Sequence, residues 1–400
     1  MSTRVDLSDT LSAYVSGEIR SADVLARAEQ ALEGDVDAGA WHEYLEATGR
    51  PAFLESLEPD ERLRWAETTY PAIARSNYTL ETMLAARVRE IPESPLFQDP
   101  GPGGLARWSY RQVQRRARNF AAVFLGEEGS PAPRVGLLVE NSVDGACCDL
   151  ACLLHDIFIS PLNVHFDDES LLWVLDRACV DTIVVDTSER ARRVLGLAET
   201  AGRDWRVYSI GMTPRLDGVT MLDEAVARLG SDEVTARLEA RPRRSIHGIA
   251  TVMFTSGSTG RPKGVAFSIY NLVTKRFARA AALPTVGRDE VMLCYLPLFH
   301  TFGRYLEMLG AMYWRGSYVF AGNPSAETLL ALLQEVQPTG LISIPLRWVQ
   351  IRDRALSREG DAGDSDAAFR AVVGSRLRWG LSAAGFLEPR VFRYFQRHGM

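Results

Sequence analysis

The segment from residue 249 to residue 264 constrains the fold of this 400-residue chain more than any other. Residues 249–254 form a short apolar run rich in β-branched side chains, which predicts a buried strand. A loop rich in Gly, Ser and Thr follows it. Glycines let the backbone approach a ligand, successive N–H groups form an anion-binding nest, and a Lys ammonium suits a phosphate oxygen. The predicted polyphosphate-binding residues are Thr255, Ser256, Gly257, Ser258, Thr259, Gly260 and Lys263.

This loop differs from the common nucleotide loop G-x-x-x-x-G-K-[ST], because Arg261 and Pro262 stand between the last Gly and the Lys. The segment TSGSTGRPKGV instead resembles the phosphate loop of the adenylate-forming superfamily, which contains acyl-CoA synthetases, luciferases and the adenylation domains of peptide synthetases. The alternative is a Gly/Ser surface loop with a solvated Lys. Turn chemistry alone does not require this order of residues.

Composition limits the class of partner and the compartment. The net charge of −6 and the lack of a long basic block exclude an electrostatic case for nucleic acid. Five cysteines, an odd number without paired C-x-x-C spacing, indicate free thiols in a reducing compartment. The N-terminus has no signal core and no apolar run approaches membrane-spanning length, so a cytoplasmic protein is expected.

Strands and helices are expected to alternate through the middle of the chain. Apolar runs at 134–139, 158–163 and 182–185 predict buried strands, and helices are expected at 143–155 and 168–178. This order is typical of a doubly wound α/β fold with mostly parallel sheets. Two more strands are expected at 316–321 and 341–345, with a helix at 326–335 between them. The Gly and Asp content of 357–368 predicts a mobile surface loop.

Residues 1–76 are expected to form an α-helical N-terminal extension of several short helices. No motif gives its role, so a docking segment and an elaboration packed on the main body are both open. The resemblance begins near Tyr78, which implies that 77–400 are part of the N-terminal core of an adenylate-forming enzyme. The extension is therefore expected to be dispensable for nucleotide binding.

A second motif lies at 293–303, where LCYLPLFHTFG resembles the family signature "LPLfH.fg" and continues most like long-chain acyl-CoA synthetases. The resemblance implies that His300 lies against the acyl pocket and the pantetheine tunnel and takes part in catalysis. A structural, hydrogen-bonded His is the alternative. The apolar face of the following helix either packs in the core or lines a fatty-acyl tunnel.

A third segment, LRWGLSAAGF at 377–386, resembles the family's "l.sGGApl" strand and loop, which implies an adenine and carboxylate site at Ala384 and Gly385. Ala383 and Ala384 replace the paired glycines of the family, and their methyl groups would narrow the site. Asp156 similarly stands where the family has a Gly that ends a helix in a left-handed conformation. That change is expected to concern helix termination and not chemistry.

The sequence ends at Met400, where the family would continue into its "YGxTE" motif. The family's magnesium-binding Glu, ribose-binding Asp and catalytic Lys all lie beyond this point, and so does its small C-terminal domain. We therefore predict no metal ligand, and we expect the core to be incomplete and this chain alone to be inactive. A C-terminal remainder or a complementing polypeptide would supply the missing groups.

The resemblance implies ATP-dependent activation of a carboxylic acid, preferably a fatty acid, to an acyl-adenylate, followed by thioester formation with CoA. ATP, Mg²⁺ and CoA are the expected cofactors and cosubstrates. Two alternatives remain open: transfer of the acyl group to a carrier protein or reductase domain, and a non-catalytic nucleotide-binding or interaction module.

Overall fold

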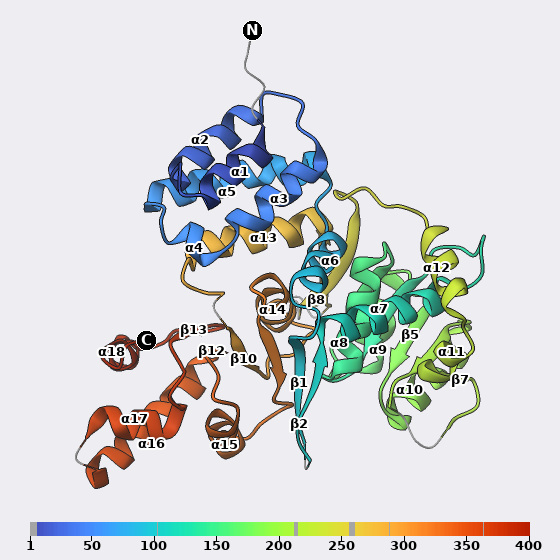
Figure 1. Cartoon of the computed structure of the whole chain (residues 1–400). Helices are drawn as coiled ribbons and strands as arrows, with labels where there is room; N and C mark the ends of the chain where they lie inside the picture. Colours follow the sequence, from blue (N-terminus) through green and yellow to red (C-terminus); the bar gives the residue numbers. More distant parts are fainter. Residues whose placement is uncertain (1–5, 102, 212–214, 256–260, 288, 363) are drawn as a thin grey trace.

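The computed structural model describes residues 6–101, 103–211, 215–255, 261–287, 289–362 and 364–400. Within these residues the chain forms two mostly parallel β-sheets surrounded by helices (Figure 1). The predicted α/β fold class is confirmed.

The seven-stranded sheet has the order β7-β6-β5-β3-β4-β8-β9. Its neighbouring strands are parallel, except that β9 runs antiparallel to β8. Its strands are β3 (Arg134–Leu138), β4 (Phe158–Pro161), β5 (Thr182–Val185), β6 (Arg206–Ser209), β7 (Val219–Met221), β8 (Ile249–Thr255) and β9 (Lys263–Ser268). The strands predicted from apolar runs are present here, whereas β9 was not predicted.

The six-stranded sheet has the order β13-β12-β10-β11-β1-β2, and only β2 is antiparallel to its neighbour. It joins strands that are far apart in sequence. Its strands are β1 (Pro95–Gly101), β2 (Gly104–Ser109), β10 (Val291–Cys294), β11 (Ser317–Phe320), β12 (Gly340–Ser343) and β13 (Trp379–Ser382).

Helices cover both faces of each sheet, as expected for a doubly wound fold. Those of the N-terminal segment are α1 (Leu7–Val15), α2 (Ser21–Ala31), α3 (Ala38–Thr48), α4 (Pro51–Leu54) and α5 (Pro59–Ser76). Those around the seven-stranded sheet are α6 (Leu80–Glu90), α7 (Tyr110–Leu125), α8 (Val143–Leu154), α9 (Asp168–Arg177), α10 (Ser188–Ala201), α11 (Leu222–Ala227), α12 (Ser231–Glu239) and α13 (Ile269–Ala282). The rest are the π-helix η1 (Phe302–Met308), α14 (Leu309–Tyr313), α15 (Ala326–Val336), α16 (Pro345–Ala362), α17 (Ser365–Val373) and α18 (Pro389–Arg397).

Side-chain caps explain where several helices begin. Ser109, Ser142 and Asp167 each accept a hydrogen bond from a backbone N–H in the first turn of α7, α8 and α9. One buried cluster then contains side chains of both sheets together with helices packed on them, so the two sheets share a core.

Of the N-terminal helices, α5 packs on α13, and the five helices share this buried cluster with the sheets (Figure 1). Trp65 on α5 is fully buried, and its ring centroid lies 5.8 Å from that of Phe277 on α13. The described helices therefore form an elaboration packed on the main body.

The prediction of a surface loop at 357–368 is wrong. Helix α16 continues to Ala362, and Asp364 then caps α17 by accepting hydrogen bonds from the backbone N–H groups of Asp366 and Ala367. Ala368 and Phe369 are buried against the six-stranded sheet. Packing on the sheet overrides the turn-forming preference of the Gly and Asp residues.

Among the described helices, none is both long and apolar enough to cross a membrane.

Candidate active site

The β8–β9 hairpin carries the predicted phosphate loop. Residues 256–260 lie outside the described residues, but the two ends of the loop are described. Thr255 pairs with Lys263 across the hairpin, and the Thr255 Oγ1 donates to the Lys263 carbonyl at 3.4 Å. Both residues are exposed. Lys263 is therefore held beside the strand end from which the loop departs, as the sequence predicts.

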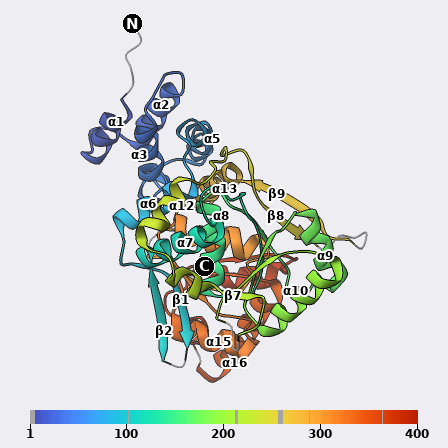
Figure 2. The ribbon, with the colours of Figure 1, turned by 90° about the vertical axis from the view of Figure 1, so that its right-hand side faces the viewer.

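The C-terminal end of the loop is attached to helix α9, which lies beside the hairpin (Figure 2). The Trp173 indole N–H donates to the Pro262 carbonyl at 3.4 Å, and the Arg261 guanidinium lies 4.7 Å from the centre of the Trp173 ring. A surface cavity of about 520 Å³ lies against Pro262 and Lys263, with Arg134 among its lining residues. The charged residues that line this cavity are all cationic, which fits an anionic ligand, whereas Arg261 lies 4.0 Å from the Glu169 carboxylate on the neighbouring side of the loop.

The turn that carries His300 follows β10 in the other sheet. Asn141, directly after β3, accepts from the Leu298 N–H at 2.9 Å and donates to the Leu296 carbonyl at 2.8 Å. Asn141 thereby fixes the turn against the carboxyl end of the seven-stranded sheet. A Cβ on Gly303 would lie 2.3 Å from the Leu296 carbonyl oxygen, so only glycine permits this close approach.

His300 lies at the surface of this turn, and its side chain has no hydrogen-bond partner among the described residues. Partial burial lowers the pKa of His300, which favours the neutral ring at pH 7. The His300 backbone is fixed instead: its N–H donates to the Pro297 carbonyl at 2.9 Å. The geometry matches a ring available to a ligand better than a hydrogen-bonded structural His, although the catalytic role of His300 stays a prediction.

The turn leads into the π-helix η1. Its side chains Arg304 and Glu307 contact the seven-stranded and the six-stranded sheet, respectively. Arg304 is fully buried and makes an ion pair with Asp149 on α8, with Nε 2.7 Å from Oδ2. Its Nη1 donates to the Thr251 hydroxyl on β8 at 2.7 Å. Glu307 is buried beside Cys294, and burial raises its pKa well above the usual range. Such π-helical turns are frequent at functional sites.

Ala384 and Gly385 follow β13 at the carboxyl edge of the six-stranded sheet, and both are exposed. The same edge carries the ends of β10 and β12, where the Tyr295 and Ser343 hydroxyls lie 2.6 Å apart. The predicted loop is thus on the same sheet edge as the His300 turn. No contact between Ala384 and the phosphate hairpin is described.

The β8–β9 hairpin and the His300 turn are linked through η1, because Arg304 donates to the Thr251 hydroxyl on β8. Phe254, the penultimate residue of β8, and Phe299, which precedes His300, belong to one buried cluster. Sequence reasoning missed Asn141 and the Asp149–Arg304 pair, which position this turn. The signal for Asn141 was its place directly after a predicted strand; a long-range ion pair leaves no such signal.

These features can be compared with known proteins. A sequence model described as "AMP-binding enzyme" matches residues 84–400. The chain belongs to the AMP-binding enzyme family. The matched region of this AMP-binding chain contains the β8–β9 hairpin, the His300 turn and the loop after β13, and it starts later than the predicted boundary at residue 77.

Two curated relatives show the range of acids that such proteins are named for. The chain is 30% identical to a 2-hydroxy-7-methoxy-5-methyl-1-naphthoate–CoA ligase of Streptomyces carzinostaticus, over 69% of this chain and 50% of the relative. It is 25% identical to long chain acyl-CoA synthetase 8 of Arabidopsis thaliana, over 70% of this chain and 42% of the relative. The AMP-binding chain thus spans about half the length of these relatives.

Solved structures show the same fold. A benzoate CoA ligase from Burkholderia xenovorans superposes with a TM-score of 0.61 at 17% identity, covering 80% of this chain and 59% of that one. Within the described part of the AMP-binding chain, no three His, Cys, Asp or Glu side chains are grouped as a metal site.

Proposed function

We propose that this chain forms the ATP- and acid-binding part of an acid–thiol ligase. In the first step a substrate carboxylate oxygen attacks the α-phosphorus of ATP, the α–β phosphoanhydride bond breaks, and acyl-AMP and pyrophosphate result. In the second step the CoA thiolate attacks the acyl carbon and AMP leaves with its electron pair.

The observation that carries this proposal is the link between the β8–β9 hairpin and the His300 turn. Arg304, in the helix that follows His300, donates to the Thr251 hydroxyl on β8, and Phe254 and Phe299 belong to one buried cluster. Preorganised cations stabilise charge that develops on a phosphate leaving group. Lys263 would act on pyrophosphate and His300 would face the acyl group. No nucleophile from the protein is needed, because the substrate supplies it.

The residues described fit a phosphate ligand but not a metal ligand set. Lys263 and Arg261 provide donors for ATP, and the Gly-rich loop, which lies outside the described residues, is predicted to add more, whereas the described part of the chain groups no carboxylates that could hold Mg²⁺. Mg²⁺ would neutralise phosphate charge when bound. We assign no residue to it.

The substrate proposed is a fatty acid, with an aryl acid as the rival. The resemblance to long-chain synthetases favours a fatty acid, and the naphthoate–CoA ligase relative is the specific observation that favours an aryl acid. A cytoplasmic location is part of the proposal and is supported by the cysteines, since all five are free and four of them are buried.

The test is acid-dependent ATP–pyrophosphate exchange by the longest natural chain. Lys263→Ala should lower the exchange rate about a hundredfold, because losing one group that stabilises developing charge costs on the order of 3 kcal/mol. Thr259→Ala, in the loop outside the described residues, should act similarly. Arg228→Ala, at an exposed cation after α11, is the control and should exchange at the wild-type rate.

Wild-type exchange in both Lys263→Ala and Thr259→Ala would refute the assignment. A panel of fatty and aryl acids identifies the acid, and CoA or a carrier protein added in the second step identifies the acceptor. ATP binding without exchange for any acid would instead favour a non-catalytic nucleotide-binding module.

A further inference from the structure

The C-terminal end of α14 is stabilised by side chains from distant elements. A helix leaves its last four carbonyls without partners inside the helix. Here the Arg87 guanidinium on α6 donates to the Met312 and Tyr313 carbonyls, each at 3.2 Å. The Tyr110 hydroxyl donates to the Ala311 carbonyl at 3.2 Å, and the Trp314 N–H donates to that of Gly310 at 2.8 Å. All four carbonyls are therefore satisfied, and a cation sits at the negative end of the helix dipole.

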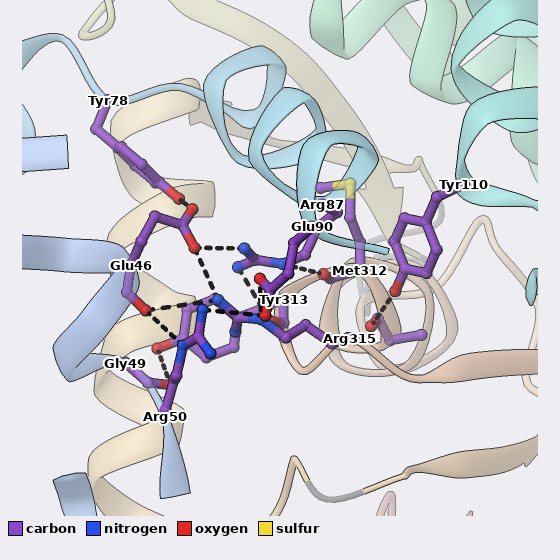
Figure 3. Close-up of polar contacts among 11 residues, drawn as sticks. Glu46, Gly49, Arg50, Tyr78, Arg87, Glu90, Tyr110, Met312, Tyr313 and Arg315 are labelled. Carbon is purple, nitrogen blue, oxygen red and sulfur yellow. Dashed lines mark hydrogen bonds and ion pairs between the residues drawn. The ribbon is translucent and has the colours of Figure 1, made fainter. Parts of the chain in front are cut away.

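Among the described residues, Glu46 is the one carboxylate that makes an ion pair with Arg87, and it belongs to the N-terminal helices (Figure 3). Glu46 on α3 makes an ion pair with the Arg87 Nη1 and accepts from the Tyr78 hydroxyl. Its Oε2 also lies 2.9 Å from the Arg315 Nη2. Glu46 lies outside the residues that match the AMP-binding family, whereas Arg87 lies inside them.

Burial makes this ion pair costly to break. The side chain of Arg87 is 2% exposed and that of Glu46 is 17% exposed. Burial on its own would lower the pKa of Arg87, but the Glu46 carboxylate offsets this and the pKa lies above its ordinary value. Removing one partner from a buried pair leaves an uncompensated charge, which is far worse than removing both. Arg315 would also lose its Glu46 contact but would keep Glu90, whose Oε2 lies 2.9 Å from the Arg315 Nε.

Helix α14 is the direct continuation of η1, which begins two residues after His300. The same helical stretch packs on β10, and buried Glu307 lies beside the Cys294 thiol at the end of that strand. Movement of the C-terminal end of α14 therefore changes the support of both the His300 turn and Cys294.

We propose that Glu46 is a positioning residue for the candidate active site. It neutralises Arg87 so that Arg87 can hold the C-terminal end of α14, and α14 in turn holds η1 and the turn that carries His300. The N-terminal helices thus contribute a residue on which the acid-binding side of the site depends. The link to acid binding rests on the proposed function; the link to η1 does not.

The first experiment measures thiol alkylation in the full chain, residue by residue, by mass spectrometry. Cys294 is buried under η1, Cys147 is buried in α8 away from α14, and Cys179 is exposed. In Glu46→Gln, Cys294 should react at least about tenfold faster than in the wild type, because a buried charge has lost its partner. Cys147 should stay protected and Cys179 should be unchanged.

The matched control is Glu43→Gln, an exposed carboxylate on the same helix, which should leave all three rates as in the wild type. Unchanged protection of Cys294 in Glu46→Gln would overturn the proposal. Equal deprotection of Cys147 and Cys294 would also overturn it, because it would show a purely global role in stability.

The double variant Glu46→Gln/Arg87→Met keeps the test usable if the single variant does not fold. It removes both charges, so its melting temperature should exceed that of Glu46→Gln, yet Cys294 should still react fast because the hydrogen bonds to Met312 and Tyr313 are gone. Wild-type protection of Cys294 in this variant would contradict the proposed route through Arg87.

A second readout is kinetic. In an active natural chain, Glu46→Gln should raise KM for the carboxylic acid about tenfold and change KM for ATP less, because α14 and η1 lead directly to the His300 turn, whereas they reach the β8–β9 hairpin through the Arg304–Thr251 hydrogen bond. Equal changes in KM for the acid and KM for ATP would contradict the proposal that Glu46 positions the acid-binding part of the site. If no acid is activated at all, the proposed function fails while the alkylation result still decides the role of Glu46.

Discussion

At the scale of single residues, seven non-glycine residues of the described chain have a left-handed backbone, and two of them, Asp156 and Ala384, stand where the resemblance places a glycine. Asp156 has φ of 61° at the end of the segment after α8, as the comparison with a family Gly predicts, and its carboxylate contacts Arg241 and Arg243. Ala384 has φ of 63° and no polar side chain to compensate. An alanine in this region costs roughly 1 kcal/mol or more.

We therefore expect Ala384→Gly to raise the free energy of unfolding by about 1 kcal/mol, because glycine adopts this conformation without strain. Ala383→Gly is the matched control: Ala383 is buried and has no positive φ, so the substitution should lower stability instead. Urea denaturation midpoints compare the variants. A destabilised Ala384→Gly would show that the alanine is not strained.

His155 predicts a pH dependence. Burial, together with nearby Arg241, lowers the pKa of this side chain to about 3, so it is neutral when folded but titrates near 6.5 when unfolded. Below pH 6.5 the unfolded state binds the extra proton, and stability falls as the pH falls towards 3. At pH 5 this costs about 2 kcal/mol.

His155→Leu should remove the part of the stability loss between pH 7 and pH 5 that comes from protonation of His155 in the unfolded state. Denaturant midpoints at both pH values measure this difference. His247→Leu, at an exposed position, controls for the loss of an imidazole and should keep the wild-type difference. An unchanged pH dependence in His155→Leu would mean that other groups cause the acid sensitivity.

At the scale of elements, the η1 helix depends on one glycine. A Cβ on Gly303 would lie 2.3 Å from the Leu296 carbonyl oxygen and 2.5 Å from that of Pro297. We expect Gly303→Ala to destabilise the protein by about 2 kcal/mol through overpacking. Gly196→Ala on α10 is the control, because its Cβ would meet no atom within 4 Å and a helical alanine should be neutral or stabilising. Thermal unfolding distinguishes the two; equal melting temperatures would contradict the predicted clash.

The elements also show what sequence patterns can predict. Short apolar runs predicted β3, β4, β5 and β8 within one or two residues, because buried parallel strands leave that pattern. The exposed strand β9 has no buried face, so its sequence carries no such signal. The segment 357–368 was predicted to be a loop because the packing on the sheet that stabilises α16 and α17 cannot be seen in the local sequence. A π-helix likewise shares the apolar spacing of an α-helix.

The sequence predicted the residues of the candidate site that lie in motifs, but not the residues that hold these motifs in place. Lys263 and His300 belong to contiguous signatures, so their loops could be named from sequence. Asn141 and Asp149 each act across 155 residues, and Glu46 acts across 41 residues on Arg87 and across 269 on Arg315, so their partners become visible only when the chain is folded.

At the scale of the whole molecule, the N-terminal helices are integrated with the main body. We expect deletion of residues 1–76 to cause association, because it uncovers the apolar face of α13 and leaves Arg87 without its carboxylate. Size-exclusion chromatography of the shortened and full chains checks this. A monodisperse shortened chain with the wild-type melting temperature would restore the expectation that these helices are dispensable.

The order of strands in the six-stranded sheet has a consequence for synthesis. Phe97 on β1 pairs with Tyr318 on β11, which is made 221 residues later. At about 5–20 residues per second, β1 waits on the order of 10–40 s for its neighbour. The seven-stranded sheet has left the ribosome in the meantime. The nascent chain must therefore carry the β1–β2 hairpin with one open edge, and holdase chaperones that bind exposed strands would meet this segment first.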